Sequence, residues 1–295
     1  MDGWLNIYKP LGMSSAAVVA KLKKLLDFKG KIGHCGTLDP LADGVLPIAL
    51  GQATKLVDYV MGGEKTYLFT IKFGSKTTTA DSQGEIISQT DIVPTSLQQL
   101  QDVCNIFIGK ITQNVPKYSA VKISGIPSYK LARAGVDVPI KSREIIISKI
   151  QLLESSFTNH TATYQVTCSK GTYIRALAED IASSLKSLGF VIRLTRLAVK
   201  GFCGTKSLAL QELLNLEDAK QILHSSLLPI ESVLCDMLSL DVTEQQAIDV
   251  LHGKQILLQH KDLDLVWLRY NGRLLTMGSL GDKKYSICRN FNFET

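Results

Sequence analysis

Residues 33–47 constrain this chain more than any other segment, because glycines and prolines recur within it at short intervals. The segment reads Gly-His-Cys-Gly-Thr-Leu-Asp-Pro-Leu-Ala-Asp-Gly-Val-Leu-Pro. Proline fixes the φ angle, and glycine lets the backbone turn where other residues cannot. Pro40 also disfavours the helical conformation at Asp39, the residue before it. The pattern predicts a shaped loop that holds the carboxylate of Asp39 in a defined place.

Two interpretations of this loop are open from the residue types alone. Loops on a rigid scaffold are where catalytic groups concentrate, so Asp39 is a candidate catalytic carboxylate. Asp-Pro and glycine-rich segments also form ordinary turns, in which the aspartate hydrogen-bonds its own backbone. The rest of the chain must decide between the two.

The size and composition of the chain are those of a globular protein, with about two domains expected for its length. Of its 295 residues, 45% are hydrophobic and 20% are charged. The 33 Lys and Arg residues exceed the 27 Asp and Glu residues, which gives a formal net charge of +6. This mild excess permits a polyanionic partner but does not establish one.

The cysteines and the N-terminus argue against several classes of protein. None of the six cysteines stands in a Cys-x-x-Cys pair and no histidine cluster accompanies them, so we expect no metal site. The first residues lack the pattern of a signal peptide, and no apolar run is long enough to span a bilayer. We therefore expect a cytoplasmic protein with reduced thiols and no membrane association.

Hydrophobic periodicity predicts strands and helices along most of the chain. Residues 67–73 alternate apolar and polar side chains, as a half-buried strand does. Thr95 and Gln98 are spaced as a capping box for the helix that follows. A helix after Gly171 would bury an apolar stripe and carry Arg175 in its first turn, off that stripe. Further strands are expected at residues 4–8, 145–152, 161–168 and 192–200, and a further helix after Ser15.

A second, smaller unit is expected towards the C-terminus, where the composition shifts. Thr243 and Gln246 have the spacing of a capping box for a short helix. Residues 265–280 then contain a hairpin around Asn271-Gly272, which is the preferred two-residue turn. Residues 237–295 are therefore predicted to form a small, mostly β module.

Residues 112–143 form a long polar and basic stretch with weak apolar periodicity. Basic residues interleaved with tyrosines suit a surface that contacts phosphates and stacks on bases. An ordinary exposed connection would have the same composition. The candidate RNA-contacting residues in this stretch are Lys117, Tyr118, Lys122, Tyr129 and Arg133.

The string at residues 33–47 closely resembles the signature of the TruB family of tRNA pseudouridine synthases. That family carries Gly-His-Thr-Gly-x-Leu-Asp-Pro-x-Ala-x-Gly-Val-Leu-Pro. Here Cys35 stands where Thr is usual, and Asp43 where Thr is common. Three further strings resemble family motifs and occur in the family's order. They are Lys-Pro-Leu-Gly-Met-Ser-Ser at 9–15, Thr-Thr-Thr-Ala-Asp-Ser-Gln-Gly at 77–84, where Thr78 replaces a common Asp, and Ser-Lys-Gly-Thr-Tyr-Ile-Arg at 169–175.

The resemblance implies that residues from distant segments form one active site. Asp39 would be the catalytic carboxylate, either as a nucleophile on the sugar or as a base, and the sequence leaves both roles open. Arg175 would keep that carboxylate ionised in a dry pocket, where burial alone disfavours the charged form. Tyr67 would stack on the target base and assist the late proton transfer at C5.

Four further residues match family positions around the substrate. His34 would occupy the space that the flipped-out base leaves, and Leu194 would pack on the target base. Tyr173 would line the same pocket, and Lys9 would support the site. On spacing alone, His34, Leu194 and Tyr67 could equally be a loop histidine, a core leucine and an edge tyrosine.

The fold implied by the resemblance is α+β, with a mixed, largely antiparallel sheet and packed helices over residues 1–236. Residues 237–295 resemble, more weakly, an RNA-binding PUA domain. The activity implied is isomerisation of uridine to pseudouridine at position 55 in the T loop of tRNA, by base flipping, glycosidic bond cleavage and carbon–carbon bond formation. This chemistry needs no cofactor. Residues 112–143 would clamp the T arm, and the enzyme would act as a monomer without an obligatory protein partner.

Three other functions are open. The first is a guide-RNA-dependent catalytic subunit of the related archaeal and eukaryotic kind, although long basic termini are not seen. The second is a chaperone that folds tRNA without modifying it, and the set of Asp39, Tyr67 and Arg175 favours an enzyme instead. The third is a hydrolase with an aspartate nucleophile, but Asp39 is not part of the Asp-x-Asp signature that such phosphatases use.

Overall fold

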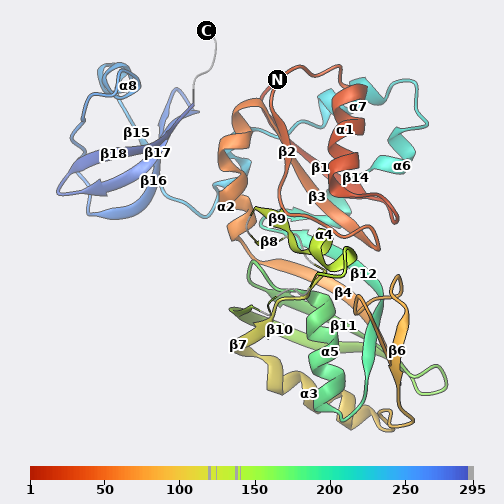
Figure 1. The fold of residues 1–295 in the computed structure, drawn as a ribbon. Helices are drawn as coiled ribbons and strands as arrows, with labels where there is room; N and C mark the ends of the chain where they lie inside the picture. Colours follow the sequence, from red (N-terminus) through yellow and green to blue (C-terminus); the bar gives the residue numbers. More distant parts are fainter. Residues whose placement is uncertain (119–120, 124, 137–138, 140, 292–295) are drawn as a thin grey trace.

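The computed structural model describes residues 1–118, 121–123, 125–136, 139 and 141–291. Within these ranges a ten-stranded mixed sheet with packed helices forms the larger part of the molecule, and a four-stranded sheet forms the C-terminal part (Figure 1). The predicted α+β fold with a small C-terminal β unit is therefore confirmed. No helix in the described ranges is both long and apolar enough to cross a bilayer.

The large sheet is mixed but mostly antiparallel. Its strands are β1 (Gly3–Lys9), β2 (Ile32–His34), β3 (Ala42–Leu50), β4 (Lys65–Phe73), β7 (Gly109–Asn114), β10 (Ser142–Ser156), β11 (Thr161–Cys168), β12 (Gly189–Val199), β13 (Phe202–Cys203) and β14 (Leu208–Ala209). They run in the order β14-β1-β3-β12-β4-β11-β10-β7, with β2 paired to β3 and β13 paired to β12. Within the described part of this large sheet, only the pairs β1–β14 and β3–β12 are parallel.

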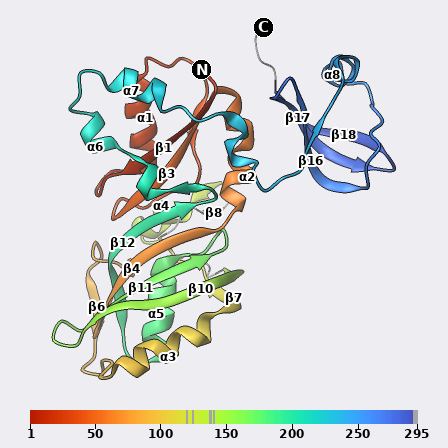
Figure 2. The same cartoon turned by 180° about the vertical axis from the view of Figure 1, so that it is seen from behind.

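Strand β4, near the centre of this sheet, shows how the sequence separates the two faces. Tyr67, Phe69 and Ile71 are buried, whereas the residues between them are half-buried. The buried side chains pack with helices α3 (Leu97–Phe107) and α5 (Ile174–Ser184), which lie on one face of the sheet (Figure 1). The opposite face of β4, β11 and β10 is open to view from behind (Figure 2). The predicted alternating strand is confirmed.

The larger part has five further helices among its described residues, most of them near the N-terminal strands (Figure 1). They are α1 (Ser15–Leu25), α2 (Val57–Gly62), α4 (Ser128–Arg133), α6 (Leu210–Leu213) and α7 (Ala219–Ser225), with 3₁₀ turns η1 (Gly51–Leu56), η2 (Gly204–Lys206) and η3 (Ile230–Val233). The predicted capping box of α3 was wrong by one residue. Ser96 and Gln99 form it, rather than Thr95 and Gln98. Both pairs have the required spacing, so the sequence pattern did not distinguish them.

Residues 112–143 contain short elements and are not one long loop. Strand β7 continues to Asn114, and β10 begins at Ser142. Between them lie the hairpin of β8 (Lys122–Ile123) and β9 (Ile126–Pro127) and then α4. In Figure 1 this hairpin and α4 lie over the middle of the large sheet. A second hairpin, of β5 (Ser75–Thr77) and β6 (Ile86–Gln89), follows β4 directly.

The C-terminal part contains a four-stranded sheet and one helix among its described residues. These are β15 (Ser239–Asp241), α8 (Glu244–Leu251), β16 (Leu263–Tyr270), β17 (Arg273–Gly281) and β18 (Lys284–Asn290), with the strands in chain order. Thr243 and Gln246 form the predicted capping box. Asn271 and Gly272 both adopt positive φ angles, 50° and 76°, as the predicted hairpin turn requires.

The segment between the two sheets is fastened to the larger part at Asp236, where the composition of the sequence shifts. The hydroxyl of Tyr59 donates to Oδ1 of Asp236 at 2.6 Å, and Nζ of Lys200 donates to Oδ2 at 2.9 Å. The end of the small sheet is also held, because Nζ of Lys55 donates to the carbonyl of Asn290 at 2.5 Å. The C-terminal part is therefore tied to the larger part at its beginning and at its end.

Candidate active site

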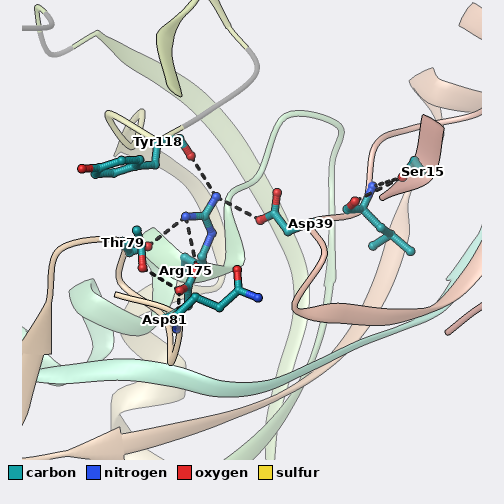
Figure 3. Close-up of polar contacts among 8 residues, drawn as sticks. Ser15, Asp39, Thr79, Asp81, Tyr118 and Arg175 are labelled. Carbon is teal, nitrogen blue, oxygen red and sulfur yellow. Dashed lines mark hydrogen bonds and ion pairs between the residues drawn. The ribbon is translucent and has the colours of Figure 1, made fainter. Parts of the chain in front are cut away.

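Asp39 lies in the loop between β2 and β3, and hydrogen bonds hold the backbone on both sides of it. The hydroxyl of Ser15 donates to the carbonyl of Leu38 at 3.1 Å and accepts from the N–H of Leu38 at 2.8 Å. The N–H of Ala42 donates to the carbonyl of Asp39 at 3.0 Å. These contacts keep the carboxylate at one position beside α5 (Figure 3).

Arg175, in the first turn of α5, is the centre of the polar cluster around this carboxylate. Its Nη2 lies 2.9 Å from Oδ2 of Asp39, and its Nη1 lies 3.4 Å from Oδ2 of Asp81. The same two nitrogens donate to the carbonyls of Tyr118 at 2.9 Å and Thr79 at 2.8 Å. The guanidinium thus joins three segments: the Asp39 loop, the hairpin after β4, and the segment just after β7 that contains Tyr118 (Figure 3).

Arg175 is buried, although the sequence places it off the apolar stripe of its helix. Its side chain is only 7% exposed. Apolar periodicity cannot predict that a charged residue is buried. The burial of a charge depends on ion pairs and hydrogen bonds that offset the cost of removing it from water. A cation near a helix N-terminus also opposes the helix dipole, and the two neighbouring carboxylates offset that cost.

Asp81 is a second carboxylate of the site, and it was not among the predicted site residues. Its Oδ1 accepts from the hydroxyl of Thr79 at 2.6 Å and from the N–H of Gln83 at 3.0 Å. The available signal was the match of residues 77–84 to a family motif. The hydroxyl of Thr78 accepts from the N–H of Glu85 at 3.2 Å, within the same hairpin.

The two carboxylates differ in their access to solvent. The side chain of Asp81 is 3% exposed and that of Asp39 is 38% exposed, and both contact the same guanidinium. A substrate that enters from solvent can therefore reach Asp39 but not Asp81. Asp81 therefore contacts the guanidinium from the buried side, and Asp39 contacts it from the side that solvent reaches.

Tyr67 lies on β4 with its side chain buried, in register with Arg196 of the neighbouring strand β12. Burial raises the pKa of the Tyr67 hydroxyl, and the positive charge of Arg196 opposes that rise. Arg196 is itself fully buried, with 1% of its surface exposed. Sequence reasoning did not select it, because a single arginine in an apolar strand has no periodic signal.

Residues 23–174 match the family model described as TruB family pseudouridylate synthase (N terminal domain). A protein of Rickettsia bellii (strain RML369-C) named tRNA pseudouridine synthase B is 46% identical over 290 residues, which cover 98% of each chain. The chain belongs to the TruB family. A protein of the same name from Rickettsia akari (strain Hartford) is 44% identical, again over 98% of each chain.

Two solved structures share the fold of this TruB-family chain. One is a Cbf5-Nop10-Gar1 complex, in which the matching chain has a TM-score of 0.72 and 23% identity, with 99% of this chain and 84% of that chain covered. The other is an archaeal box H/ACA sRNP Nop10-Cbf5 complex, with a TM-score of 0.71 and 21% identity, which covers 98% and 85%. At these identities the likeness concerns the fold alone.

Leu194 and His34 are two further positions that match the TruB family. Leu194 is buried on β12 in the same apolar cluster as Tyr67. His34 ends β2, and burial followed by the charge of Arg196 lowers its pKa below the usual range, so the ring is neutral at pH 7. Its Nδ1 is buried without a hydrogen-bond partner among the described residues.

Tyr173 and Lys9 are held by backbone contacts rather than by the two carboxylates. Tyr173 precedes α5, and its N–H and carbonyl bind the side-chain amide of Gln113 at 2.8 and 3.1 Å. Lys9 is fully buried, and its ammonium donates to the carbonyls of Pro10 at 3.0 Å and Met13 at 2.6 Å. Burial lowers the pKa of Lys9 to about 8.

The basic stretch contacts the central guanidinium of the site through Tyr118. The carbonyl of Tyr118 accepts from Arg175, and Lys117 next to it is exposed. Three other predicted RNA-contacting residues have side chains outside the described part of the structure: Lys122, Tyr129 and Arg133.

Proposed function

We propose that this TruB-family chain isomerises a uridine of tRNA to pseudouridine, at position 55 in the T loop. The observation that carries the proposal is the contact of 2.9 Å between Arg175 and Asp39, the more exposed of the two carboxylates. The relatives named tRNA pseudouridine synthase B match this chain over nearly its whole length, which supports the same substrate class.

The reaction is a rearrangement in which atoms and electrons balance without an oxidant. The bond between N1 of uracil and C1′ of the sugar breaks, the base rotates, and C5 joins C1′. C5 then loses its proton and N1 takes one from solvent. No redox or phosphoryl transfer occurs, so the chain needs no cofactor for it. Because the target base lies within a folded loop, the enzyme must first flip the nucleotide into its pocket.

Asp39 would act on the sugar, either by attack at C1′ or by removal of the proton at C2′. Both roles need the carboxylate in its ionised form. The adjacent guanidinium of Arg175 would pair with that negative charge and fix the orientation of the carboxylate. Asp81 and two carbonyls hold Arg175 in turn, so the guanidinium stays in a fixed position beside Asp39.

Tyr67 would stack on the flipped uracil and receive the C5 proton in the last step. Its position on the buried face of β4, in one apolar cluster with Leu194, suits a residue that packs against a base. His34 would fill the gap that the base leaves in the RNA stack. A neutral ring is the form that stacks there without the cost of burying a charge.

The distribution of charge supports an RNA-binding role for residues 112–143. This stretch contains six Lys and Arg residues and one Asp, a net charge of +5 out of +6 for the whole chain. Residues 237–295 contain seven basic and seven acidic residues, so they are neutral. Binding through 112–143 would release counterions from the T arm. The PUA-like residues 237–295 would touch the acceptor end, and the enzyme would act as a cytoplasmic monomer without a protein partner.

Incubation of the purified protein with an unmodified tRNA transcript, followed by mapping of pseudouridine, tests the proposal. We expect conversion of one T-loop uridine without any added guide RNA. Conversion only with a guide would favour the guide-dependent subunit, and tRNA binding without conversion would favour the folding chaperone.

The variant Tyr67→Phe separates substrate binding from proton transfer. Phenylalanine keeps the ring that would stack on the base and removes only the hydroxyl. We expect tRNA binding within about twofold of wild type and turnover reduced by about 100-fold or more, the scale of a general base. Full activity of this variant would refute the proton-transfer role.

A further inference from the structure

Arg196 is a buried cation that joins the two ends of the Asp39 loop. It lies on β12, between Gly44 of β3 and Tyr67 of β4 in the strand register. Its Nη2 donates to the carbonyl of Gly36 at 3.0 Å, and its Nε donates to the carbonyl of Val45 at 2.8 Å. These two carbonyls stand on either side of Asp39 in the sequence. One guanidinium therefore spans the base of the loop.

Two glycines of the loop make room for Arg196. A Cβ atom on Gly44 would lie 2.3 Å from the carbonyl oxygen of Arg196, which is closer than real Cβ contacts allow. A Cβ atom on Gly36 would lie 3.4 Å from Nη1 of the guanidinium, at a φ angle of 99° that other residues rarely adopt. The loop thus packs closely against the backbone of Arg196 at Gly44 and against its guanidinium at Gly36.

The positive charge of Arg196 has no carboxylate partner among the described residues and acts on nearby titratable side chains. Among the described residues no carboxylate lies within ion-pair distance of it, and its guanidinium donates to the two carbonyls. A buried charge without a carboxylate partner is costly, so a purely structural role does not favour arginine at this position. Burial is the main cause of the lowered pKa of His34 and of Lys9, and the positive charge of Arg196 lowers both further. The same charge opposes the rise that burial causes in the pKa of Tyr67.

We propose that Arg196 is a positioning residue that couples the Asp39 loop to Tyr67. It holds both ends of the loop against β12 and presents a fixed positive charge to the Tyr67 hydroxyl. That charge opposes the cost that burial imposes on negative charge at the Tyr67 oxygen. The oxygen takes the proton from C5 as its own hydroxyl proton passes to solvent, and the C5–H electron pair restores the C5–C6 double bond. This inference rests on the proposed function and adds a residue outside the set implied by the family strings.

The test compares two variants with different losses. Arg196→Met removes both the charge and the two hydrogen bonds. Arg196→Lys keeps the charge on one nitrogen, and cannot reach both carbonyls in the geometry of the guanidinium. Arg193→Lys is the matched control, because Arg193 is exposed on the same strand and the substitution is the same. Circular dichroism and tRNA binding establish that each protein is folded.

The readout is single-turnover conversion of tRNA that carries hydrogen or deuterium at C5 of uridine. For Arg196→Met we expect conversion slowed by about 100-fold and a larger deuterium effect than in wild type, because C5 proton removal becomes the slow step. For Arg196→Lys we expect slower conversion with the wild-type deuterium effect, because the loop loosens while the charge remains. Arg193→Lys should match wild type in both.

Two results would overturn the inference. One is an Arg196→Met protein that is slower with an unchanged deuterium effect, since that leaves Tyr67 unaffected. The other is an Arg196→Lys protein with the wild-type rate, since that variant lacks the two-carbonyl contact. If the Arg196→Met protein does not fold, the rate of Arg196→Lys alone tests the inference. A wild-type protein that forms no pseudouridine would refute the proposed function instead, so the two failures are distinct.

Discussion

Replacement of Arg175 by lysine removes the guanidinium and keeps its charge. The two terminal nitrogens make four contacts, two to carboxylates and two to carbonyls. A lysine ammonium has one nitrogen where the guanidinium has two terminal nitrogens, so it cannot contact Asp39 and Asp81 at the same time. We therefore expect about half of these contacts to be lost. Each charge-assisted hydrogen bond is worth about 1.5–3 kcal/mol, which gives about 3–6 kcal/mol in total. The partial exposure of Asp39 favours the lower end.

A loss of about 3 kcal/mol corresponds to a rate lowered by at least about 100-fold. The assay is single-turnover conversion of an unmodified tRNA transcript, with tRNA affinity measured separately. Because the lost contacts orient the reacting carboxylate, we expect the rate to fall and the affinity to stay within about threefold. Arg193→Lys serves as the control for an exposed arginine. A lysine variant that converts tRNA at more than a third of the wild-type rate would refute the reasoning.

Three further outcomes follow from the same contacts. Asp81→Asn keeps the side-chain shape but leaves Arg175 with one carboxylate, so we expect loss of about 3 kcal/mol of stability in urea unfolding and slower conversion; an unchanged unfolding midpoint would contradict this. Ser15→Ala leaves the N–H of Leu38 without its partner, which should cost about 1–3 kcal/mol in the same assay, with wild-type stability as the opposing result. Burial raises the pKa of Asp180 to about 6, so its contribution to stability is present below about pH 4 and is lost as pH rises through 6. Asp180→Asn should therefore raise the melting temperature at pH 8 and not at pH 4, and an equal change at both would contradict this.

Much of the fold could be predicted because local patterns decide it. The alternation of β4 follows from apolar residues at every second position, and the Asn271-Gly272 turn follows from backbone conformations that few residues adopt. The α3 capping box was misplaced because two overlapping pairs have the same spacing. Propensity and spacing therefore predict that a helix or strand exists more reliably than they predict its first residue.

The site was predictable only in part, because charge pairing is a long-range property. The contact between Asp39 and Arg175 was expected from the resemblance of two strings that lie far apart in the chain. Asp81 and Arg196 were missed as site residues because their burial depends on partners from other segments. Asp81 and Arg196 are only 2% and 1% exposed, and no periodic pattern in the sequence predicts that a charged residue will be buried in this way.

The replacement of Asp39 by asparagine tests the assigned chemistry most directly. Asparagine keeps the size of the side chain and an oxygen that Arg175 can bind, but it has no negative charge with which to act on the sugar. Wild type and Asp39→Asn should bind unmodified tRNA with similar affinity. The wild-type protein should form pseudouridine at one T-loop uridine, and the variant should form none above background. Equal conversion by both proteins would contradict the assignment of Asp39 as the reacting group.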